Sequence, residues 1–403
     1  MTVQSIQAHN HDDVAVAKRN VTLLTAAQAL GGATPPIIIS LGGVIGLQLA
    51  ENKALATLPI SLLNIGVAAS VIPAAWLMRT HGRRVGYIFG CMAGVVSGII
   101  AAAGSVQRAF WLFCLGTFIS GFYIAFVQSY RFAAADSAPD SGKAKAISMV
   151  MVGGLFAAVI GPQTVIWTRD IAPQYPFAAT FFALSSLALL AMVVVSLLNA
   201  PAPKKTSHGG RPLGEIMRQP RFITAVIAGL VSYGLMAFLM TAAPMAMVAC
   251  GHTIGEAALG IQWHVLAMFG PSFFTGNLIS RYGKDKITAL GLLMIAAAAV
   301  IGLSGLSLAH FWIALILLGV GWNFGFVGAT SMVTDCYRPE ERNKVQAAND
   351  FLVFGSVAVA SLSSGKLLHL GGWDVVNWVV FPAVALALAM VAIQARSGRS
   401  VAA

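Results

Sequence analysis

Two short apolar stretches collect side chains that bind soft metal ions. MAFLMTAAPMAM runs from Met236 to Met247 and holds four methionines, and HVLAM runs from His264 to Met268. Met236 and Met240 are four residues apart, as are His264 and Met268, so each pair shares one face of a helix. Thioether sulfur favours Cu(I) over Zn(II), Fe(II) or Mg(II), and imidazole also serves copper. The pattern therefore predicts a copper site made of three methionines and one histidine.

The same residues have plainer interpretations. Methionine is a flexible apolar filler, so Met236 and Met240 alone are more typical of core packing. His264 is the stronger signal, because an ionisable residue deep in a membrane span is usually functional, although proton coupling or a structural hydrogen bond would use it equally well. Cys250 and His252, in the turn between the two stretches, are candidates for a capture point at the outer mouth. The N-terminal stretch AHNHDD is better explained as a solvated tail.

The elements that position these residues must be membrane helices. The chain has 403 residues, of which 58% are hydrophobic and only 10% charged, whereas a soluble domain has about 25% charged residues. A soluble chain cannot bury so much apolar surface, so the bilayer is the solvent. The net charge of +11 comes from basic residues in short loops, which indicates membrane orientation and not nucleic-acid binding. The four cysteines show neither a disulfide framework nor zinc spacing.

We count twelve apolar spans, each long enough to cross a core of roughly 30 Å as a helix that rises about 1.5 Å per residue. Of the 25 Lys and Arg residues, 21 lie on one side of these spans, and four, Lys53, Arg108, Arg169 and Lys366, lie on the other. The richer side is cytoplasmic by the positive-inside rule, so both termini are inside. The approximate ends of the spans are 21–49, 54–78, 85–106, 109–130, 146–167, 177–199, 222–250, 257–280, 287–308, 311–334, 347–368 and 375–394.

The two metal-binding stretches fall at similar depths in neighbouring antiparallel helices. Met240 is ten residues from the outer end of its span, and Met268 is about eleven from the outer start of the next. At about 1.5 Å per residue both lie roughly 15 Å deep, near the midplane. Transporters with two related halves bind their substrates at that depth.

The chain also repeats itself at a constant offset. Gly82 and Gly283, Lys143 and Lys344, and Ala146 and Ala347 are each 201 residues apart. We therefore predict two six-helix bundles, at 21–199 and 222–395, that both begin inside. A cytoplasmic linker rich in Pro, Gly and Lys joins them at 200–221, with a cytoplasmic N-terminal tail at 1–20 and a C-terminal tail at 396–403. This all-α membrane protein resembles the major facilitator transporters, which have a parallel repeat of six helices.

Two basic loops carry a further resemblance to that superfamily. RTHGRR, after the second span, resembles the end of its signature G-x-x-x-D-R-x-G-R-R, although the usual Asp is absent. RYGKDK is the corresponding loop in the second half, after the eighth span. The resemblance implies that both loops help to gate the cytoplasmic side, while topology-setting charge explains them equally well. The residues concerned are Arg79, Gly82, Arg83, Arg84, Arg281, Gly283 and Lys284.

MxxxM followed by HxxxM on such a scaffold resembles the CcoA-like copper importers of bacterial inner membranes. The resemblance implies that Met236, Met240, His264 and Met268 bind copper as the transported substrate, with no prosthetic group and with periplasmic or cytoplasmic copper carriers as partners. The family is also similar to bacterial riboflavin transporters. Riboflavin or another small organic substrate is therefore the alternative, and a polar cavity for it has its own candidate residues: Asn64, Gln128, Trp322 and Asn323.

Other classes of function fit the sequence less well. A proton-coupled efflux carrier usually needs a buried acid, but all fourteen Asp and Glu residues fall in a loop, a tail or a helix end. This argues against a carboxylate relay but leaves His264 free to carry the proton, so such a carrier stays a further alternative. An enzyme needs convergent acid, base and nucleophile groups, and the chain has no HExxH motif and no nucleophile elbow. The sequence thus predicts a multi-pass secondary transporter of the bacterial inner membrane that is not an enzyme and imports copper by alternating access.

Overall fold

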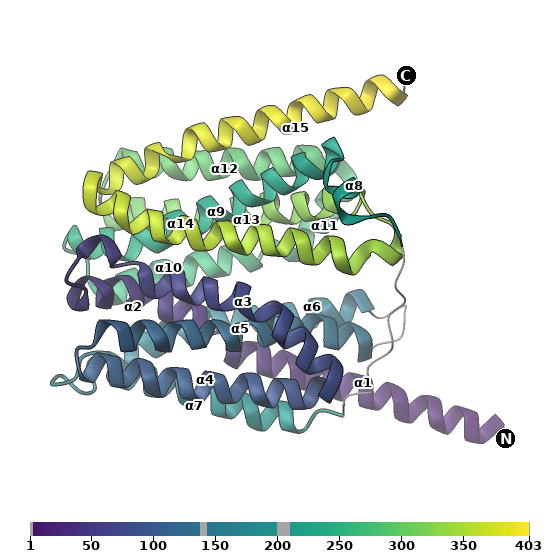
Figure 1. Ribbon diagram of the computed structural model, residues 1–403, viewed down its shortest axis with the longest axis horizontal. Helices are drawn as coiled ribbons and strands as arrows, with labels where there is room; N and C mark the ends of the chain where they lie inside the picture. The colour runs from purple at the N-terminus through teal and green to yellow at the C-terminus, as the bar shows by residue number, and fades with distance from the viewer. Residues whose placement is uncertain (1–2, 138–142, 200–209, 403) are drawn as a thin grey trace. The chain divides into compact units, whose positions relative to one another are not determined.

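The computed structural model describes residues 3–137, 143–199 and 210–402, and all its regular elements in these ranges are helices (Figure 1). Within these ranges, ten helical segments are long and apolar enough to cross a membrane. The expectation of an all-α membrane fold is confirmed. The first half of the predicted linker, 200–209, and the side chains of the AHNHDD stretch lie outside the described residues.

The first six predicted spans correspond to seven helices. The first span, 21–49, is divided into two helices by a turn at Gly32 and Ala33, and the earlier of the two already begins at Val3, within the predicted tail. The seven helices are α1 (Val3–Gly31), α2 (Thr34–Leu49), α3 (Leu58–His81), α4 (Arg83–Val106), α5 (Phe110–Ser137), α6 (Lys143–Thr168) and α7 (Ala178–Ser196).

The last six predicted spans begin after a short helix in the linker. The eighth span, 257–280, is broken at Gly270 and Pro271, so neither piece counts as a spanning helix by itself. The eleventh and twelfth form one run, Lys344–Ala395, so ten segments plus the broken helix account for twelve spans. The helices are α8 (Leu213–Met217), α9 (Pro220–Ala249), α10 (Ile254–Phe269), α11 (Ser272–Tyr282), α12 (Lys284–Ser304), α13 (Leu308–Val333), α14 (Arg342–Trp378) and α15 (Val380–Ala402).

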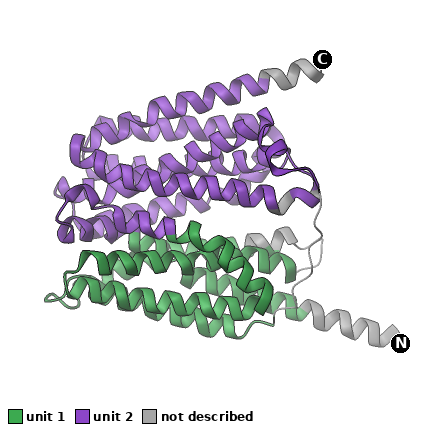
Figure 2. Cartoon of the chain, in the orientation of Figure 1, with its two compact units in different colours: residues 1–38, 66–204 green, residues 39–65, 205–403 purple. Residues whose placement is uncertain are grey.

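The helices pack as two compact units (Figure 2). Unit 1 contains residues 1–38 and 66–204, and unit 2 contains residues 39–65 and 205–403. Within unit 2 the segment 39–65 contacts the later helices closely. Asn64 donates a hydrogen bond from Nδ2 to Ser361 Oγ at 3.1 Å. This residue, which the sequence suggests as part of a polar cavity, is therefore bonded to α14.

The two repeated glycines have the same backbone conformation. Gly82, before α4, has φ 84° and ψ 159°, and Gly283, before α12, has φ 91° and ψ 152°. Essentially only glycine adopts this region, because a Cβ atom would clash with the backbone. The constant offset of 201 residues in the sequence therefore marks two turns of identical geometry, one in each unit.

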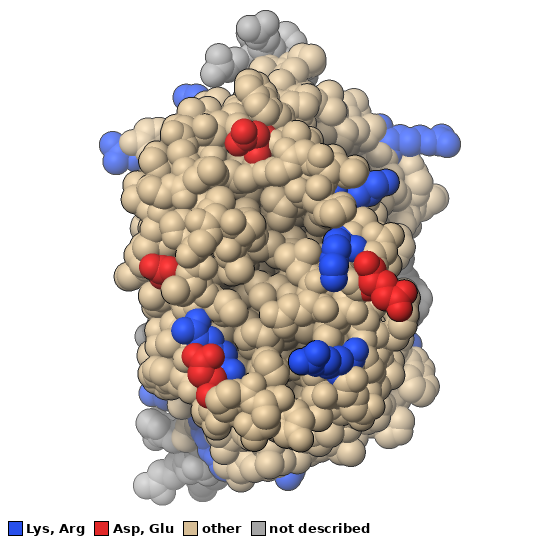
Figure 3. All heavy atoms as spheres, turned by 90° about the vertical axis from the view of Figure 1, so that its left-hand side faces the viewer, with Lys and Arg blue, Asp and Glu red and all other residues tan. Residues whose placement is uncertain are grey.

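The surface of the helices is poor in charge. Large apolar side chains such as Ile72 and Trp167 are mostly exposed. Figure 3 looks onto the ends of the helices at the left of Figure 1, where a few basic and acidic side chains, some of them side by side, lie within mostly uncharged surface. Exposed apolar surface of this extent is typical of a protein that contacts lipid.

Candidate functional site

The four residues of the predicted copper site all lie in unit 2 and are all buried. Met236 and Met240 lie on α9, and His264 and Met268 lie on α10, which packs against α9. The exposed fraction is 0% for His264 and at most 7% for the three methionines. In the described ranges no three His, Cys, Asp or Glu side chains come together as metal ligands. A copper site here depends on methionine sulfur, and its ligand set stays a prediction.

The ring of His264 is held by a third helix. Its Nδ1 lies 2.7 Å from the carbonyl oxygen of Leu315 on α13. Because a carbonyl only accepts, Nδ1 carries the proton and donates it, and Nε2 has a free lone pair. Nε2 is buried and has no hydrogen-bond partner among the described residues. A backbone carbonyl that fixes one ring nitrogen leaves the other available to a metal ion or a hydrogen-bond donor.

The residues of the predicted outer capture point have different surroundings. Cys250 is exposed and its thiol is free. His252 is half-buried, its Nε2 lies 2.9 Å from the carbonyl oxygen of Leu306, and its ring packs edge-on against Phe311. The hydrogen bond to Leu306 uses one ring nitrogen of His252. The capture role of Cys250 and His252 stays a prediction.

Five aromatic rings from four helices form a continuous cluster in unit 2, which we call the aromatic cluster. Trp322 lies at its centre, with ring centroids 5.4 Å from Phe326, 5.4 Å from Tyr233 and 6.2 Å from Phe269. Trp322 and Phe326 are stacked at 15°, and Phe354 extends the cluster 5.8 Å from Tyr233. Trp322 is 7% exposed, whereas the other four rings are partly exposed. The sequence analysis had singled out Trp322 alone, because the other rings join it only when the four helices pack.

The helix break beside this cluster is held by a buried amide. Asn323, next to Trp322, donates from Nδ2 to the Met268 carbonyl at 2.6 Å and to Ser272 Oγ at 2.8 Å. Its Oδ1 accepts a hydrogen bond from Thr275 Oγ1 at 2.6 Å. Pro271 has no N–H to continue the helical ladder, so carbonyl groups before it need other donors. The sequence suggests Asn323 as a residue that lines a polar cavity. In the structure its side chain joins α10 to α11.

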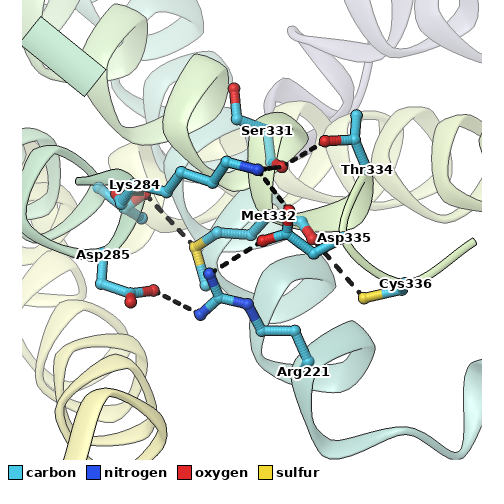
Figure 4. A network of polar contacts seen from close by, with 9 residues as sticks. Arg221, Lys284, Asp285, Ser331, Met332, Thr334, Asp335 and Cys336 are labelled. Atoms are coloured by element: carbon cyan, nitrogen blue, oxygen red, sulfur yellow. Dashed lines mark hydrogen bonds and ion pairs between the residues drawn. The ribbon is translucent and has the colours of Figure 1, made fainter. Parts of the chain in front are cut away.

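The second predicted gating loop belongs to a network of ion pairs (Figure 4). Lys284 forms an ion pair with Asp335 and donates a hydrogen bond to the Ser331 carbonyl at 2.8 Å. Arg221 bridges Asp285 at 2.5 Å and Asp335 at 3.2 Å. The network joins the starts of α9 and α12 to the end of α13. Arg281 is exposed and lies over the ring of Tyr282, outside this network.

The first predicted gating loop lies in unit 1 and has a simpler set of contacts than the second loop. Arg83 forms an ion pair with Asp136, which joins the start of α4 to the end of α5. Arg83 and Lys284 are 201 residues apart, and each follows a repeated glycine. Arg79 and Arg84 are exposed. Partly exposed pairs of this kind contribute about 0–1 kcal/mol each, and the gating role of both loops stays a prediction.

These features define a multi-pass membrane protein built from two repeated groups of helices. The sequence model of the Major Facilitator Superfamily matches residues 21–271 and 225–401, which together span nearly the whole chain. The chain belongs to this superfamily of transporters. A crystal structure of a mutant of the nucleoside transporter NupG has the same fold, with a TM-score of 0.72, 13% identity, and coverage of 94% of this chain and 99% of that one.

Two relatives in sequence are informative. The riboflavin transporter RfnT of Brucella anthropi is 58% identical over 380 residues, which are 93% of this chain and 96% of that protein. The uncharacterised transporter YdeG of Bacillus subtilis is 30% identical over 369 residues, covering 87% of this chain and 86% of that protein. The prediction of a major facilitator transporter is confirmed. The riboflavin relative favours the organic alternative of the sequence analysis over copper import.

Proposed function

We propose that this protein imports riboflavin, or a closely related flavin, across the bacterial cytoplasmic membrane by alternating access. The observation that carries the proposal is the 58% identity with the riboflavin transporter RfnT, which extends over nearly the full length of both chains. The charge distribution agrees with it. Riboflavin is neutral and needs no buried counter-charge, and the sequence places no acidic residue in the middle of a predicted span, although Asp350 lies two turns into α14.

Uptake by whole cells tests this proposal. The gene would be expressed in a bacterial strain that cannot make riboflavin and lacks its own transporter, and radiolabelled riboflavin uptake would be followed beside growth on low riboflavin. We expect restored growth and saturable uptake. If a well-expressed protein in the membrane gives neither, riboflavin is not its substrate.

Copper import is the second candidate, and the surroundings of His264 favour it. The Nδ1–H group donates to the Leu315 carbonyl and the buried Nε2 has no partner among the described residues, as in a histidine that binds metal. Neutral imidazole and thioether ligands would hold Cu(I) weakly enough to release it. Met236, Met240 and Met268 are the sulfur ligands that this candidate requires.

One pair of variants separates the two candidates. His264→Ala removes the imidazole, and Met240→Leu removes a sulfur while it keeps the apolar volume. If copper is carried, the wild type accumulates copper and both variants lose most of that accumulation. If the wild type takes up riboflavin and cellular copper is unchanged by its expression, the copper candidate fails. Riboflavin uptake by Met240→Leu would then identify Met240 as a packing residue.

A further inference from the structure

The rings of the aromatic cluster lie in the middle part of their membrane spans, with Phe269 at the end of α10, where the eighth span is broken. Tyr233 is the fourteenth of the 30 residues of α9, and Trp322 is the fifteenth of the 26 residues of α13. Phe269 lies at the break between α10 and α11, and Phe354 lies near the centre of α14 before its kink at Gly372. Because a spanning helix centres on the bilayer, all these rings lie near the midplane, where transporters of this architecture bind substrate.

Trp322 also holds an unused hydrogen-bond donor at that depth. Its Nε1 is buried and has no partner among the described residues. A buried N–H without an acceptor costs about 1–3 kcal/mol, so native structures rarely keep one without a reason. Trp373 provides the contrast within the same unit. It is 8% exposed, and its Nε1 donates to the Gly302 carbonyl at 3.0 Å.

We propose that the aromatic cluster binds the ring system of the substrate, a planar heteroaromatic molecule with a hydrogen-bond acceptor on its edge for Trp322 Nε1–H. The proposal rests on the proposed function, and it names the residues that recognise the flavin ring. Riboflavin has such a ring, with carbonyl oxygens and ring nitrogens along one edge. Tyr233, Phe269, Phe326 and Phe354 present partly exposed aromatic surface for stacking, and Trp322 fixes the orientation of the ring.

Two features distinguish this cluster from ordinary core packing. Packing alone is served as well by aliphatic side chains and leaves no polar atom unpaired. The cluster combines an unpaired indole N–H with four rings that the described residues do not fully cover. The helix break at Gly270 and Pro271 lies directly beside it, and discontinuous helices line the substrate sites of transporters.

A binding assay on the purified protein tests the proposal. Riboflavin and lumiflavin, which keeps the tricyclic ring and lacks the ribityl chain, would each be titrated in detergent and followed by quenching of flavin fluorescence. Trp322→Phe keeps a ring and removes the N–H group. We expect it to raise the Kd of both ligands by the same factor, about three- to tenfold, the effect of one neutral hydrogen bond. Trp322→Leu, which also removes the ring, should raise both Kd values further.

Two more variants make the result specific. Trp373→Phe is the matched control, because it makes the same chemical change at a tryptophan of equal burial whose N–H is already bonded. It should leave both Kd values unchanged. Phe354→Leu removes a ring at the edge of the cluster and should weaken both ligands. Thermal unfolding and gel filtration would show that each variant is folded.

The outcomes separate this proposal from the proposed function. If the wild type carries riboflavin but Trp322→Phe and Phe354→Leu bind both flavins as the wild type does, the ring lies elsewhere and only this inference is overturned. Loss of riboflavin affinity without loss of lumiflavin affinity would overturn it too, because the cluster would then recognise the ribityl chain. If the wild type neither binds nor carries riboflavin, both proposals are overturned.

Discussion

His264 and Trp322 are buried polar rings that each keep one unpaired nitrogen. His264 Nε2 and Trp322 Nε1 have no partner among the described residues, and both lie in unit 2. Asn323 and Trp373 are equally buried, but their polar groups bond to backbone carbonyls and side chains. In a bundle surrounded by lipid, where water does not pair polar groups, such an atom points to a ligand or a bound water.

Gly283 is a residue whose role is set by backbone conformation alone. At φ 91° and ψ 152°, an added Cβ would meet no atom of a more distant residue within 4 Å, so Gly283→Ala tests the strain of the local backbone alone. We expect a loss of about 1–3 kcal/mol in unfolding free energy, measured as a lower thermal unfolding midpoint in detergent. Gly276→Ala is the control, because Gly276 lies in α11 with equally open surroundings and Ala is favoured in a helix. Equal midpoints for the two variants would contradict the strain argument.

At the scale of elements, the broken α10–α11 helix depends on Asn323. Asn323→Leu removes the hydrogen bonds to Met268, Ser272 and Thr275 and leaves buried polar atoms unpaired. We expect about 1–3 kcal/mol of destabilisation and reduced transport, because the break lies beside the aromatic cluster. Thermal unfolding and riboflavin uptake would measure the two effects. Asn277→Ala, on the exposed surface of α11, should change neither. Normal stability of Asn323→Leu would mean that the break does not need this amide.

Arg211, two residues before the short helix α8, is paired with a buried carboxylate of unit 2. Glu341, whose side chain is 0% exposed, accepts hydrogen bonds from Arg211 Nη2 at 2.8 Å and from Arg211 N at 2.7 Å. The Arg211 guanidinium and the Arg338 N–H hold the pKa of the Glu341 carboxyl well below its usual range. Ile216 of α8 is buried against Phe222 and Val345.

Acid should therefore weaken the ion pair of Arg211 and Glu341. Because the pKa of Glu341 is lower in the folded state, its stabilising effect is complete above the unfolded pKa of about 4.3 and is lost progressively as the pH falls below it. We expect Glu341→Gln to lower the unfolding midpoint at neutral pH and to flatten its decline in acid. Midpoints measured across this pH range would check both effects. Glu340→Gln, at the exposed neighbour, should keep the pH dependence of the wild type.

At the scale of the whole molecule, hydropathy predicted the helices well, because a spanning segment needs only length and apolar composition. The break in the eighth span was missed, although Gly270 and Pro271 were visible, since a single proline does not show which side chain will satisfy the freed carbonyls. The aromatic cluster was missed because Tyr233, Trp322 and Phe354 are brought together only by the packing of distant helices. The methionine pairs alone do not distinguish a copper site from core packing, because four-residue spacing arises from both.

The orientation of the whole chain can be tested with its own cysteines. Cys250 is exposed in the turn after α9, which the positive-inside rule places outside. Cys91, Cys114 and Cys336 are buried, and burial raises the pKa of the Cys336 thiol to about 11, so this thiol is also unreactive at neutral pH. A membrane-impermeant maleimide added to intact spheroplasts should therefore label the wild type at a single thiol.

The variant Cys250→Ala gives the decisive comparison. It should lose the label completely in intact spheroplasts, and mass spectrometry of the wild type should find the adduct on the peptide that contains Cys250. Wild-type protein that is labelled only after the membrane is opened would place the α9–α10 turn in the cytoplasm. That result would reverse the orientation of all the spans at once, because each short loop fixes the side of the next.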